Sequence, residues 1–231
     1  MSGTSKAPKV PAGLVFFEGQ EKPRQYVIFQ KALIEGQKEM EVFTTSSLQL
    51  SYPFLDPAQG EIRWEDGRWL YKNMSENVFT FVRGQILARG EERELTDSTV
   101  IRLSNNRMLT AVFLEQFASC TDWRFINMDD GRHTVRIENG AEGGGESALS
   151  LEYDNGRWLL GDFSDGELNL NGKPVAEGSQ IRFDDCLQIG DTRFIFEGSG
   201  LLYGNRTYEG GLSVHIDERT VINSLKRVTL L

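Results

Sequence analysis

Apolar and polar residues alternate in short runs along most of this 231-residue chain. Runs such as Val27–Phe29, Glu61–Trp64 and Trp69–Tyr71 are bounded by Gly, Asp or Asn, and similar runs recur about every 8–12 residues. Apolar spacing typical of amphipathic helices is almost absent. The pattern therefore predicts an all-β protein built from a sandwich or a barrel.

The alternating pattern is repeated once within the chain. Three blocks return in the same order, at offsets of 89, 88 and 86 residues. They are EIRWEDGRWLYKNMS from Glu61 with SLEYDNGRWLLGDFS from Ser150, FTFVRGQ from Phe79 with ELNLNGK from Glu167, and DSTVIRLS ending at Ser104 with DDCLQIG ending at Gly190. This period is too long for a solenoid repeat. It predicts two similar β-sandwich domains in tandem, with Trp69 and Trp158 buried at equivalent positions.

The flanking segments differ from the repeat in composition. The first 25 residues are rich in Pro, Gly, Lys and Ser around one apolar patch, Leu14–Phe17, and predict a flexible leader. The apolar end Val228–Leu231 leads us to expect that the chain is a fragment of a longer protein. The predicted organisation is a leader over 1–25, domain 1 over 26–113, domain 2 over 114–200, and over 201–231 a C-terminal strand and linker toward a missing domain.

Composition and charge narrow the class of partner. Hydrophobic residues make up 39% of the chain and charged residues 26%, a globular composition. Twenty-five basic against 34 acidic side chains give a net charge of −9, without a cluster of Lys and Arg along the sequence. We therefore expect no nucleic-acid partner and no direct membrane insertion. No apolar run reaches the length of a membrane span or a secretory signal, which predicts a cytosolic segment.

The residues that usually carry catalysis or bind cofactors occur here singly. Cys120 and Cys186 lack metal-ligand or redox spacing, so we expect reduced, packed thiols. His133 and His215 stand apart from each other, and Gly172-Lys173 has no P-loop context. The sequence predicts a segment that is not an enzyme and binds no cofactor.

The order of the repeated blocks resembles the forkhead-associated (FHA) domain, a β-sandwich that generally binds phosphothreonine peptides. The second copy matches the family pattern better than the first, and together the copies cover about residues 26–200. The matching segments are Asn155–Trp158, Leu170–Gly172, Leu187–Gly190 and Phe194–Phe196 in copy two, and Asp66–Trp69, Phe81–Gly84 and Val100–Leu103 in copy one.

The phosphate-binding residues of the family pattern are not retained. Its Ser-x-x-His falls on Asp56–Gln59 in copy one and on Gly145–Ala148 in copy two. A phosphothreonine needs several charge-assisted hydrogen-bond donors, which these residues do not supply. The family's Asn falls on Val78, beside Asn77, in copy one and on Gly166 in copy two. Its Gly-Arg falls on Asn127-Met128 or, with another gap placement, on Gly131-Arg132.

These losses lead us to expect a non-catalytic protein-interaction module that does not depend on phosphate. The alternative is a phosphothreonine-binding domain in copy two. For this alternative the candidate contact residues are Arg132, with Ser147 and Asn169 or Asn171 as auxiliary donors. For binding without phosphate they are Glu138, Glu142 and Glu146 of an acidic, Gly-rich loop over 138–146, which would favour a basic surface.

The tail GGLSVHIDERTVINSLKRVTLL, from Gly210 to Leu231, resembles the strand that precedes the nucleotide-binding domain of bacterial FHA-containing ABC transporter ATPases. The resemblance implies a cytosolic N-terminal module of a membrane-associated parent. Its partners would be proteins, including other domains or subunits of that ATPase. The membrane ATPases of type VII secretion, which also begin with tandem degenerate FHA domains, are the alternative parent.

Overall fold

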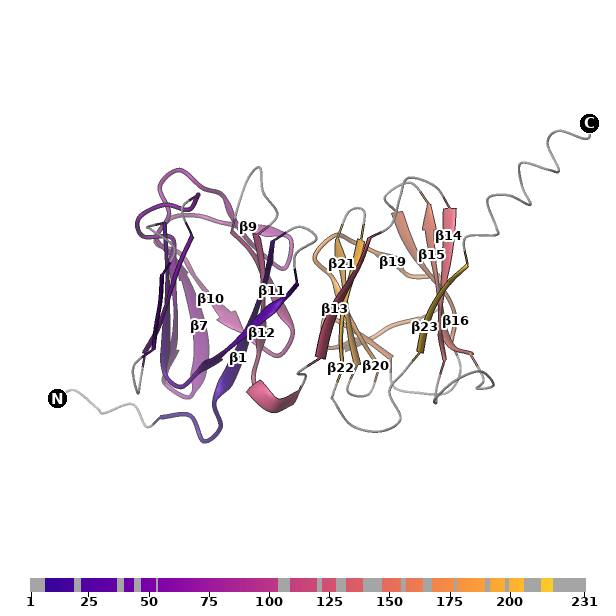
Figure 1. Ribbon diagram of the computed structural model, residues 1–231, viewed down its shortest axis with the longest axis horizontal. Coiled ribbons are helices and arrows are strands. Elements are labelled where there is room, and N and C mark those ends of the chain that lie inside the picture. Colours follow the sequence, from indigo (N-terminus) through magenta and orange to yellow (C-terminus); the bar gives the residue numbers. More distant parts are fainter. Residues whose placement is uncertain are drawn as a thin grey trace, which may run out of the picture. The chain divides into compact units, whose positions relative to one another are not determined.

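The computed structural model divides the chain into two compact units, Met1–Thr121 and Asp122–Leu231. In each unit two β-sheets face each other (Figure 1). The fold is thus all-β, with two sandwiches in tandem, as predicted. The structure describes residues 7–18, 22–36, 40–43, 47–52, 54–103, 109–119, 122–127, 132–138, 147–154, 157–163, 168–176, 178–189, 192–197, 200–205 and 213–217.

The first unit pairs two six-stranded sheets, ordered β2-β1-β12-β11-β8-β9 and β10-β7-β6-β3-β5-β4. All neighbouring strands are antiparallel except β3 and β5, which run parallel. The strands are β1 (Ala12–Glu18), β2 (Arg24–Ile28), β3 (Lys31–Glu35), β4 (Met40–Phe43), β5 (Ser47–Ser51), β6 (Gly60–Glu65), β7 (Arg68–Asn73), β8 (Thr80–Val82), β9 (Gln85–Leu87), β10 (Glu92–Leu95), β11 (Thr99–Arg102) and β12 (Leu109–Leu114), followed by the short 3-10 helix η1 (Phe117–Ser119).

The second unit pairs a six-stranded sheet, β13-β22-β21-β20-β17-β18, with a five-stranded sheet, β19-β16-β15-β14-β23. Its strands are β13 (Asp122–Asn127), β14 (Arg132–Glu138), β15 (Ser147–Asp154), β16 (Arg157–Phe163), β17 (Leu168–Leu170), β18 (Lys173–Pro174), β19 (Gln180–Ile181), β20 (Cys186–Ile189), β21 (Thr192–Glu197), β22 (Gly200–Asn205) and β23 (Ser213–Asp217).

One tryptophan in each unit packs between the two sheets. Trp69 on β7 is 4% exposed, and its ring lies 5.6 Å from that of Phe113 on the facing strand β12. Trp158 on β16 is 3% exposed, and its ring lies 5.1 Å from that of Phe196 on the facing strand β21. The prediction of equivalent buried tryptophans is confirmed.

The hairpin that leads into Trp69 explains the residues of the first repeated sequence block. Asp66 and Gly67 both have positive φ, at 50° and 84°. Two successive residues in this region form the tight turn whose twist matches that of antiparallel strands. The turn places Trp64 opposite Trp69 on the adjacent strand, with ring centroids 5.5 Å apart. The block therefore encodes both the reversal of the chain and its aromatic anchor.

The predicted leader and first boundary need correction. Residues 12–18, assigned to a flexible leader, form β1, which pairs with β12 and β2. Leu14 and Phe16 are at most 1% exposed in the first core. Leu114, assigned to the second domain, ends β12, and residues 117–119 form η1 in the first unit, where Phe117 N–H donates to Pro11 O at 2.9 Å. The continuous apolar run of residues 12–17, within a Pro-rich and Gly-rich segment, is typical of a strand buried on both faces.

The C-terminal assignment also needs correction. Residues 200–205 form β22 between β13 and β21, and residues 213–217 form β23 beside β14. Both strands belong to the sheets of the second unit, whereas the sequence assigned 201–231 to a strand and linker outside the domain. The two copies thus take the strand at one equivalent place in the sheet from different parts of the chain. In the first unit it is β1, the first strand, which lies next to β12, and in the second it is β22, which follows β21.

Replacing either tryptophan should destabilise its own unit. Trp69→Ala and Trp158→Ala each remove an aromatic side chain from between two sheets, for an expected loss of about 3–5 kcal/mol. Urea titration followed by hydrogen exchange and mass spectrometry reports each unit separately. Leu159→Ala is the matched control, because Leu159 adjoins Trp158 but is 43% exposed. A loss below about 1 kcal/mol for Trp158→Ala would contradict its role as an anchor.

Candidate functional site

The carboxylate of Asp56 joins two loops at one end of the first sandwich. Asp56 lies between β5 and β6, and its partners lie between β7 and β8. Its Oδ2 atom accepts hydrogen bonds from Ser75 Oγ at 2.6 Å, Glu76 N at 2.6 Å and Asn77 N at 2.7 Å. Its Oδ1 atom accepts from Asn77 Nδ2 at 3.2 Å. The side chain is only 8% exposed, so it is an internal anion surrounded by donors.

A second set of buried amides and hydroxyls continues from Asp56 into the sandwich. Gln59, which is fully buried, accepts from Asp56 N through Oε1 at 3.4 Å and donates from Nε2 to Thr80 Oγ1 at 3.0 Å. Thr80 Oγ1 donates to Asn73 Oδ1 at 3.1 Å, and Asn73 Nδ2 donates to Leu87 O at 2.7 Å. A satisfied buried network of this kind holds its loops in one arrangement.

The surroundings of Asp56 favour its charged form. Burial raises the pKa of the Asp56 carboxyl, but hydrogen bonds from Ser75, from the side chain and backbone of Asn77, and from the backbone of Glu76 outweigh it and lower the pKa to about 2. Donors that hold a carboxylate in this way stabilise its ionised form. At neutral pH the loops between β5 and β6 and between β7 and β8 therefore enclose a negative charge.

This site occupies the positions where the family pattern placed its phosphate-binding residues. The sequence aligned the family's Ser and His with Asp56 and Gln59, and the structure shows these two residues in contact. The family's Asn was aligned with Val78, but the polar partner is the neighbouring Asn77. Sequence reasoning missed Ser75 altogether. A signal was present, because Ser and Asn near a turn often bond to nearby backbone groups.

In the second unit, the predicted phosphate-binding residues do not converge. Arg132 begins β14 opposite Asp154, whereas Ser147 begins β15 opposite Glu138 at the other end of the same strand pair. Six residues of strand separate the two ends, which is about 20 Å. The side chains of Arg132, Ser147 and Glu138 lie outside the described part of the structure, as do Glu142 and Glu146 entirely.

The two candidate asparagines lie on the other sheet of the second unit. Asn169 pairs with Gln188 and Pro174 in the β17 ladder. Asn171, in the turn after β17, donates from Nδ2 to Asp185 Oδ1 at 2.7 Å and accepts from Cys186 N at 3.0 Å. The amide of Asn171 thus serves the fold. Cys186 is buried, as predicted for a packed cysteine, and Cys120 lies outside the described residues.

A groove of about 270 Å³ lies at the opposite end of the first unit from Asp56, beside the turn of the β6–β7 hairpin. Its charged residues are two bases and two acids, and one pair, Arg68 and Glu94, forms a salt bridge of 3.6 Å. The groove therefore has no net charge preference. It is lined by Pro8, Lys9, Val10, Trp64, Gly67, Arg68, Trp69, Glu94, Leu95, Glu115 and Gln116.

In the part of the chain that the structure describes, no group of three or more His, Cys, Asp or Glu side chains could hold a metal ion. None of its helical segments has the length and apolarity that a membrane-spanning helix needs.

No protein-family model matches the sequence, and no curated protein matches it. Among solved structures, the chain is similar to full-length yeast Pml1p, at 13% identity and a TM-score of 0.38 over 49% of this chain and 85% of that one. It is similar to an FHA domain of an Arabidopsis thaliana protein, at 15% identity and a TM-score of 0.36 over 49% and 93% of the two chains.

Another similar structure is the N-terminal FHA domain of EssC, a component of the bacterial type VII secretion apparatus. Its identity is 13% and its TM-score 0.30, over 89% of this chain and 100% of that one.

Asp56→Asn should destabilise the first unit and make its free energy of unfolding less sensitive to acid. The lowering of the Asp56 pKa from 3.8 to about 2 corresponds to about 2.5 kcal/mol of stabilisation at neutral pH. A lowered native pKa gives stability that is present above about pH 4 and lost as the pH falls through about 2. We expect Asp56→Asn to lose about 2–3 kcal/mol at pH 7 and much less near pH 2, measured by urea unfolding.

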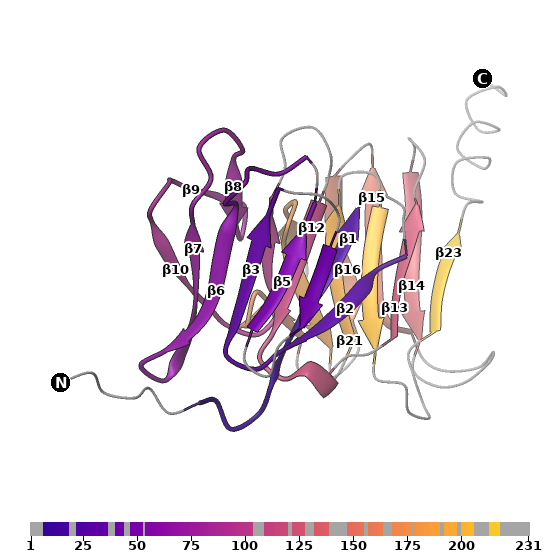
Figure 2. The same ribbon diagram turned by 60° about the vertical axis from the view of Figure 1, so that its left-hand side comes forward.

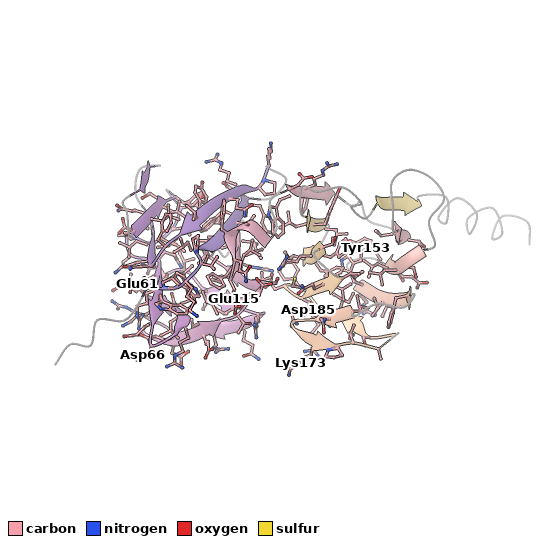
Figure 3. The ribbon with its side chains drawn as sticks, turned by 90° about the horizontal axis from the view of Figure 1, so that it is seen from below. Glu61, Asp66, Glu115, Tyr153, Lys173 and Asp185 are labelled. Carbon is pink, nitrogen blue, oxygen red and sulfur yellow. The ribbon has the colours of Figure 1, made fainter. Side chains whose placement is uncertain are left out.

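The matched control for that substitution is Asp66→Asn. Asp66 is exposed at the tip of the β6–β7 hairpin (Figure 3), and Asn tolerates its positive φ. Its unfolding free energy should change by less than about 0.5 kcal/mol. Equal losses for the two substitutions would show that Asp56 stabilises the unit no more than a surface carboxylate does.

Proposed function

We propose that this chain is a non-catalytic protein-interaction module of two FHA-like sandwiches, and that its binding does not depend on phosphothreonine. The observation that carries the proposal is the Asp56 carboxylate. It accepts hydrogen bonds from two backbone N–H groups and two side chains in the loops where the resemblance placed phosphate recognition. The donors that an incoming phosphate would use are already bonded to an anion of the protein itself.

Electrostatics support this interpretation. A phosphothreonine carries nearly two negative charges at neutral pH. Two unit charges of like sign at 4 Å repel by about 4 kcal/mol at an effective dielectric of 20, so a phosphate beside ionised Asp56 would be strongly disfavoured. The low pKa of Asp56 means that the carboxylate stays charged over the whole physiological range of pH.

The second unit supports the proposal through its strand register. Arg132 and Ser147 are about 20 Å apart along the β14–β15 pair, so one phosphate cannot contact both. Asn171 uses its side chain within its own turn. Phosphothreonine binding by the second unit remains the second candidate function, carried by Arg132 alone.

We further propose that the module belongs to the cytosolic N-terminal part of a bacterial membrane transport ATPase, where it contacts other domains or subunits. The support is the resemblance of residues 210–231 to the strand that precedes the nucleotide-binding domain of FHA-containing ABC transporters. An ATPase of type VII secretion is the alternative parent.

Phosphorylation should not strengthen peptide binding. A degenerate peptide pool with a central phosphothreonine and the same pool with unmodified threonine are each titrated into the protein by calorimetry. The expected affinities agree within about twofold, because the donors beside Asp56 are already bonded to its carboxylate and Arg132 and Ser147 lie at opposite ends of their strand pair. A phosphate-dependent affinity in the micromolar range that Arg132→Ala abolishes would establish the second candidate function instead.

Small carboxylates should rescue a protein that lacks the Asp56 side chain. In Asp56→Ala, the donors on Ser75, Glu76 and Asn77 lose their acceptor, and formate can take its place. With a dissociation constant near 10 mM, 100 mM formate would stabilise the variant by about 1.4 kcal/mol. Thermal unfolding in sodium formate, compared with sodium chloride at equal ionic strength, measures this effect. Equal stabilisation of the wild-type protein would contradict occupation of an anion site by Asp56.

A further inference from the structure

Two turns meet at one end of the first sandwich. One is the turn between β8 and β9, which contains Arg83, and the other runs from Thr96 to Thr99 between β10 and β11. The strands β9 and β10 lie at the same side of the unit (Figure 2), and a side-chain hydrogen bond joins them. Asp56 bonds to the loop before β8, so the turn after β8 lies at the opposite end of the strand.

The guanidinium group of Arg83 connects these two turns. Its Nη2 atom donates to Thr96 Oγ1 and, at 3.1 Å, to Thr99 Oγ1. The hydroxyl of Thr99 is fully engaged, because it also accepts from Thr96 N at 3.1 Å and donates to Thr96 O at 2.8 Å. Thr96 is exposed, and within the described residues its hydroxyl has no contact besides the one with Arg83.

The two acceptors that Arg83 contacts carry no charge. Within the part of the chain that the structure describes, Arg83 forms no ion pair. The carboxylate of Asp97 is engaged elsewhere, since its Oδ1 atom accepts from Glu115 N at 3.0 Å and its Oδ2 atom from Ser98 Oγ at 3.2 Å. A positive charge is thus positioned at an exposed hydroxyl without an anion to neutralise it.

The second unit contains the same pair of turns, which can be matched through their backbone hydrogen bonds. In each unit, the first turn bonds to the strand that follows the second turn, and a bond between the fourth and first residues closes the second turn. The third residue of the second turn has positive φ in both units, 60° in Ser98 and 68° in Asp184. The corresponding residues are Arg83 and Asn171, Thr96 and Arg182, and Thr99 and Asp185.

The matched side-chain contact in the second unit contains an anion. Asn171 Nδ2 donates to Asp185 Oδ1 at 2.7 Å, so a neutral donor meets a carboxylate. In the first unit, the cationic donor Arg83 meets the hydroxyl of Thr99. Arg83 also has a φ of 51°, in a region that Asn adopts more readily than Arg does. The first unit therefore keeps a charged, less favourable residue at the turn and lacks the anion that would pair with it.

We infer that Thr96 is a phosphorylation site, and that Arg83 binds the phosphate and thereby ties the β8–β9 hairpin to the turn before β11. A phosphothreonine carries nearly two negative charges and three acceptor oxygens, which guanidinium groups bind in pairs. A kinase can reach Thr96 but not its neighbours, because Ser98 and Thr99 are 9% and 0% exposed. The inference does not depend on the proposed function, since this phosphate belongs to the chain itself and lies at the opposite end from Asp56.

The modification is a phosphoryl transfer from ATP, carried out by a serine/threonine protein kinase. Thr96 Oγ1 attacks the γ-phosphorus of ATP, and the hydroxyl proton passes to a base of the kinase. The bond from that phosphorus to the β,γ-bridging oxygen breaks, and ADP leaves. A kinase with a basic peptide groove is expected to select this segment, because acidic residues surround Thr96 in the sequence. They are Glu91, Glu92, Glu94 and Asp97.

The stability of the full 231-residue protein tests the contact between the phosphate and Arg83. Phosphothreonine is incorporated at position 96 during translation, by suppression of a stop codon, and the product is compared with the unmodified protein. The thermal unfolding midpoint of the first unit should rise by about 3 °C, because a charge-assisted pair replaces hydrogen bonds to neutral hydroxyls. Amide exchange in residues 80–87, followed by mass spectrometry, should slow about fivefold.

Arg83→Asn is the decisive variant, because it installs the residue that the second unit has at the same turn. The unmodified variant should fold with an unchanged or higher unfolding midpoint, since Asn suits the positive φ. Phosphothreonine at position 96 should then give no gain in midpoint and no slowing of exchange. Arg68→Gln, which removes another exposed guanidinium group at the same end of the unit, is the matched control and should keep the whole gain.

A second experiment tests whether Thr96 accepts the phosphoryl group. The unmodified protein is incubated with Mg²⁺, ATP and a serine/threonine kinase that prefers acidic flanking residues, and peptide mass spectrometry locates the phosphate. Thr96 should be modified at least about tenfold faster than Ser98 or Thr99, which are accessible only when the turn opens. Thr96→Val should remove the modification from this turn.

Several outcomes would overturn the inference. They are an unchanged or lowered midpoint with phosphothreonine at position 96, a gain that survives Arg83→Asn, and a kinase reaction that leaves Thr96 unmodified. Inorganic phosphate separates a free anion from a covalent one. If about 20 mM sodium phosphate stabilises the wild-type protein as much as phosphothreonine does, relative to sodium chloride at equal ionic strength, and Arg83→Asn abolishes the effect, the turns bind a free anion and Thr96 is not a modification site.

Discussion

Contact between the two sheets of each sandwich, centred on one tryptophan, is the interaction on which the rest of the structure depends. Trp69 and Trp158 each reach an aromatic ring on the facing sheet, at 5.6 and 5.1 Å. A sheet that is apolar on one face must cover that face, and a large rigid ring covers more area than any aliphatic side chain. Once these contacts hold the sheets together, the loops and edge strands are free to change.

The ends of the sandwiches show how far that freedom extends. In the first unit, the loops around Asp56 are closed by a buried carboxylate and an amide network, which fixes their shape without any ligand. In the second unit, an Asn side chain ties its turn to the neighbouring strand. Because the donors of these loops bond to the Asp56 carboxylate, the loops keep one arrangement.

The internal duplication makes each copy a reference for the other. Both units build the same hairpin, one with Phe81 and Ile86 and the other with Asn169 and Pro174. Because the fold is shared, the difference cannot come from the requirements of folding. At the equivalent turns, Arg83 of the first unit and Asn171 of the second both have positive φ, a conformation that Asn adopts more readily than Arg.

Local patterns were sufficient to predict the fold class, the duplication and the buried tryptophans. Alternation and turn chemistry act between near neighbours, so the hairpins ending in Trp69 and Trp158 could be identified from the sequence. The strand at residues 12–18 was missed because its partner, β12, lies about 100 residues further along the chain. The tail was predicted to contain a strand, which is β23, but it was placed outside the second domain because its partner β14 lies about 80 residues earlier. β22 was assigned to the same tail although it pairs with the preceding strand β21.

The candidate site depended still more on the tertiary structure. From the sequence, Asp56 and Gln59 were recognised only as residues that replaced a Ser and a His. Their partners Ser75 and Asn77 come from another loop, and only the folding of β6 against β7 brings the two loops together. In the same way, only the facing of the two sheets brings Arg93 on β10 against Gln85 on β9. The sequence by itself determined the fold class and the hairpins of the repeat, because alternation and turn preferences are local. Which side chains share a site was decided by the tertiary structure, because hydrogen bonds and charge act over distances that only the folded chain defines.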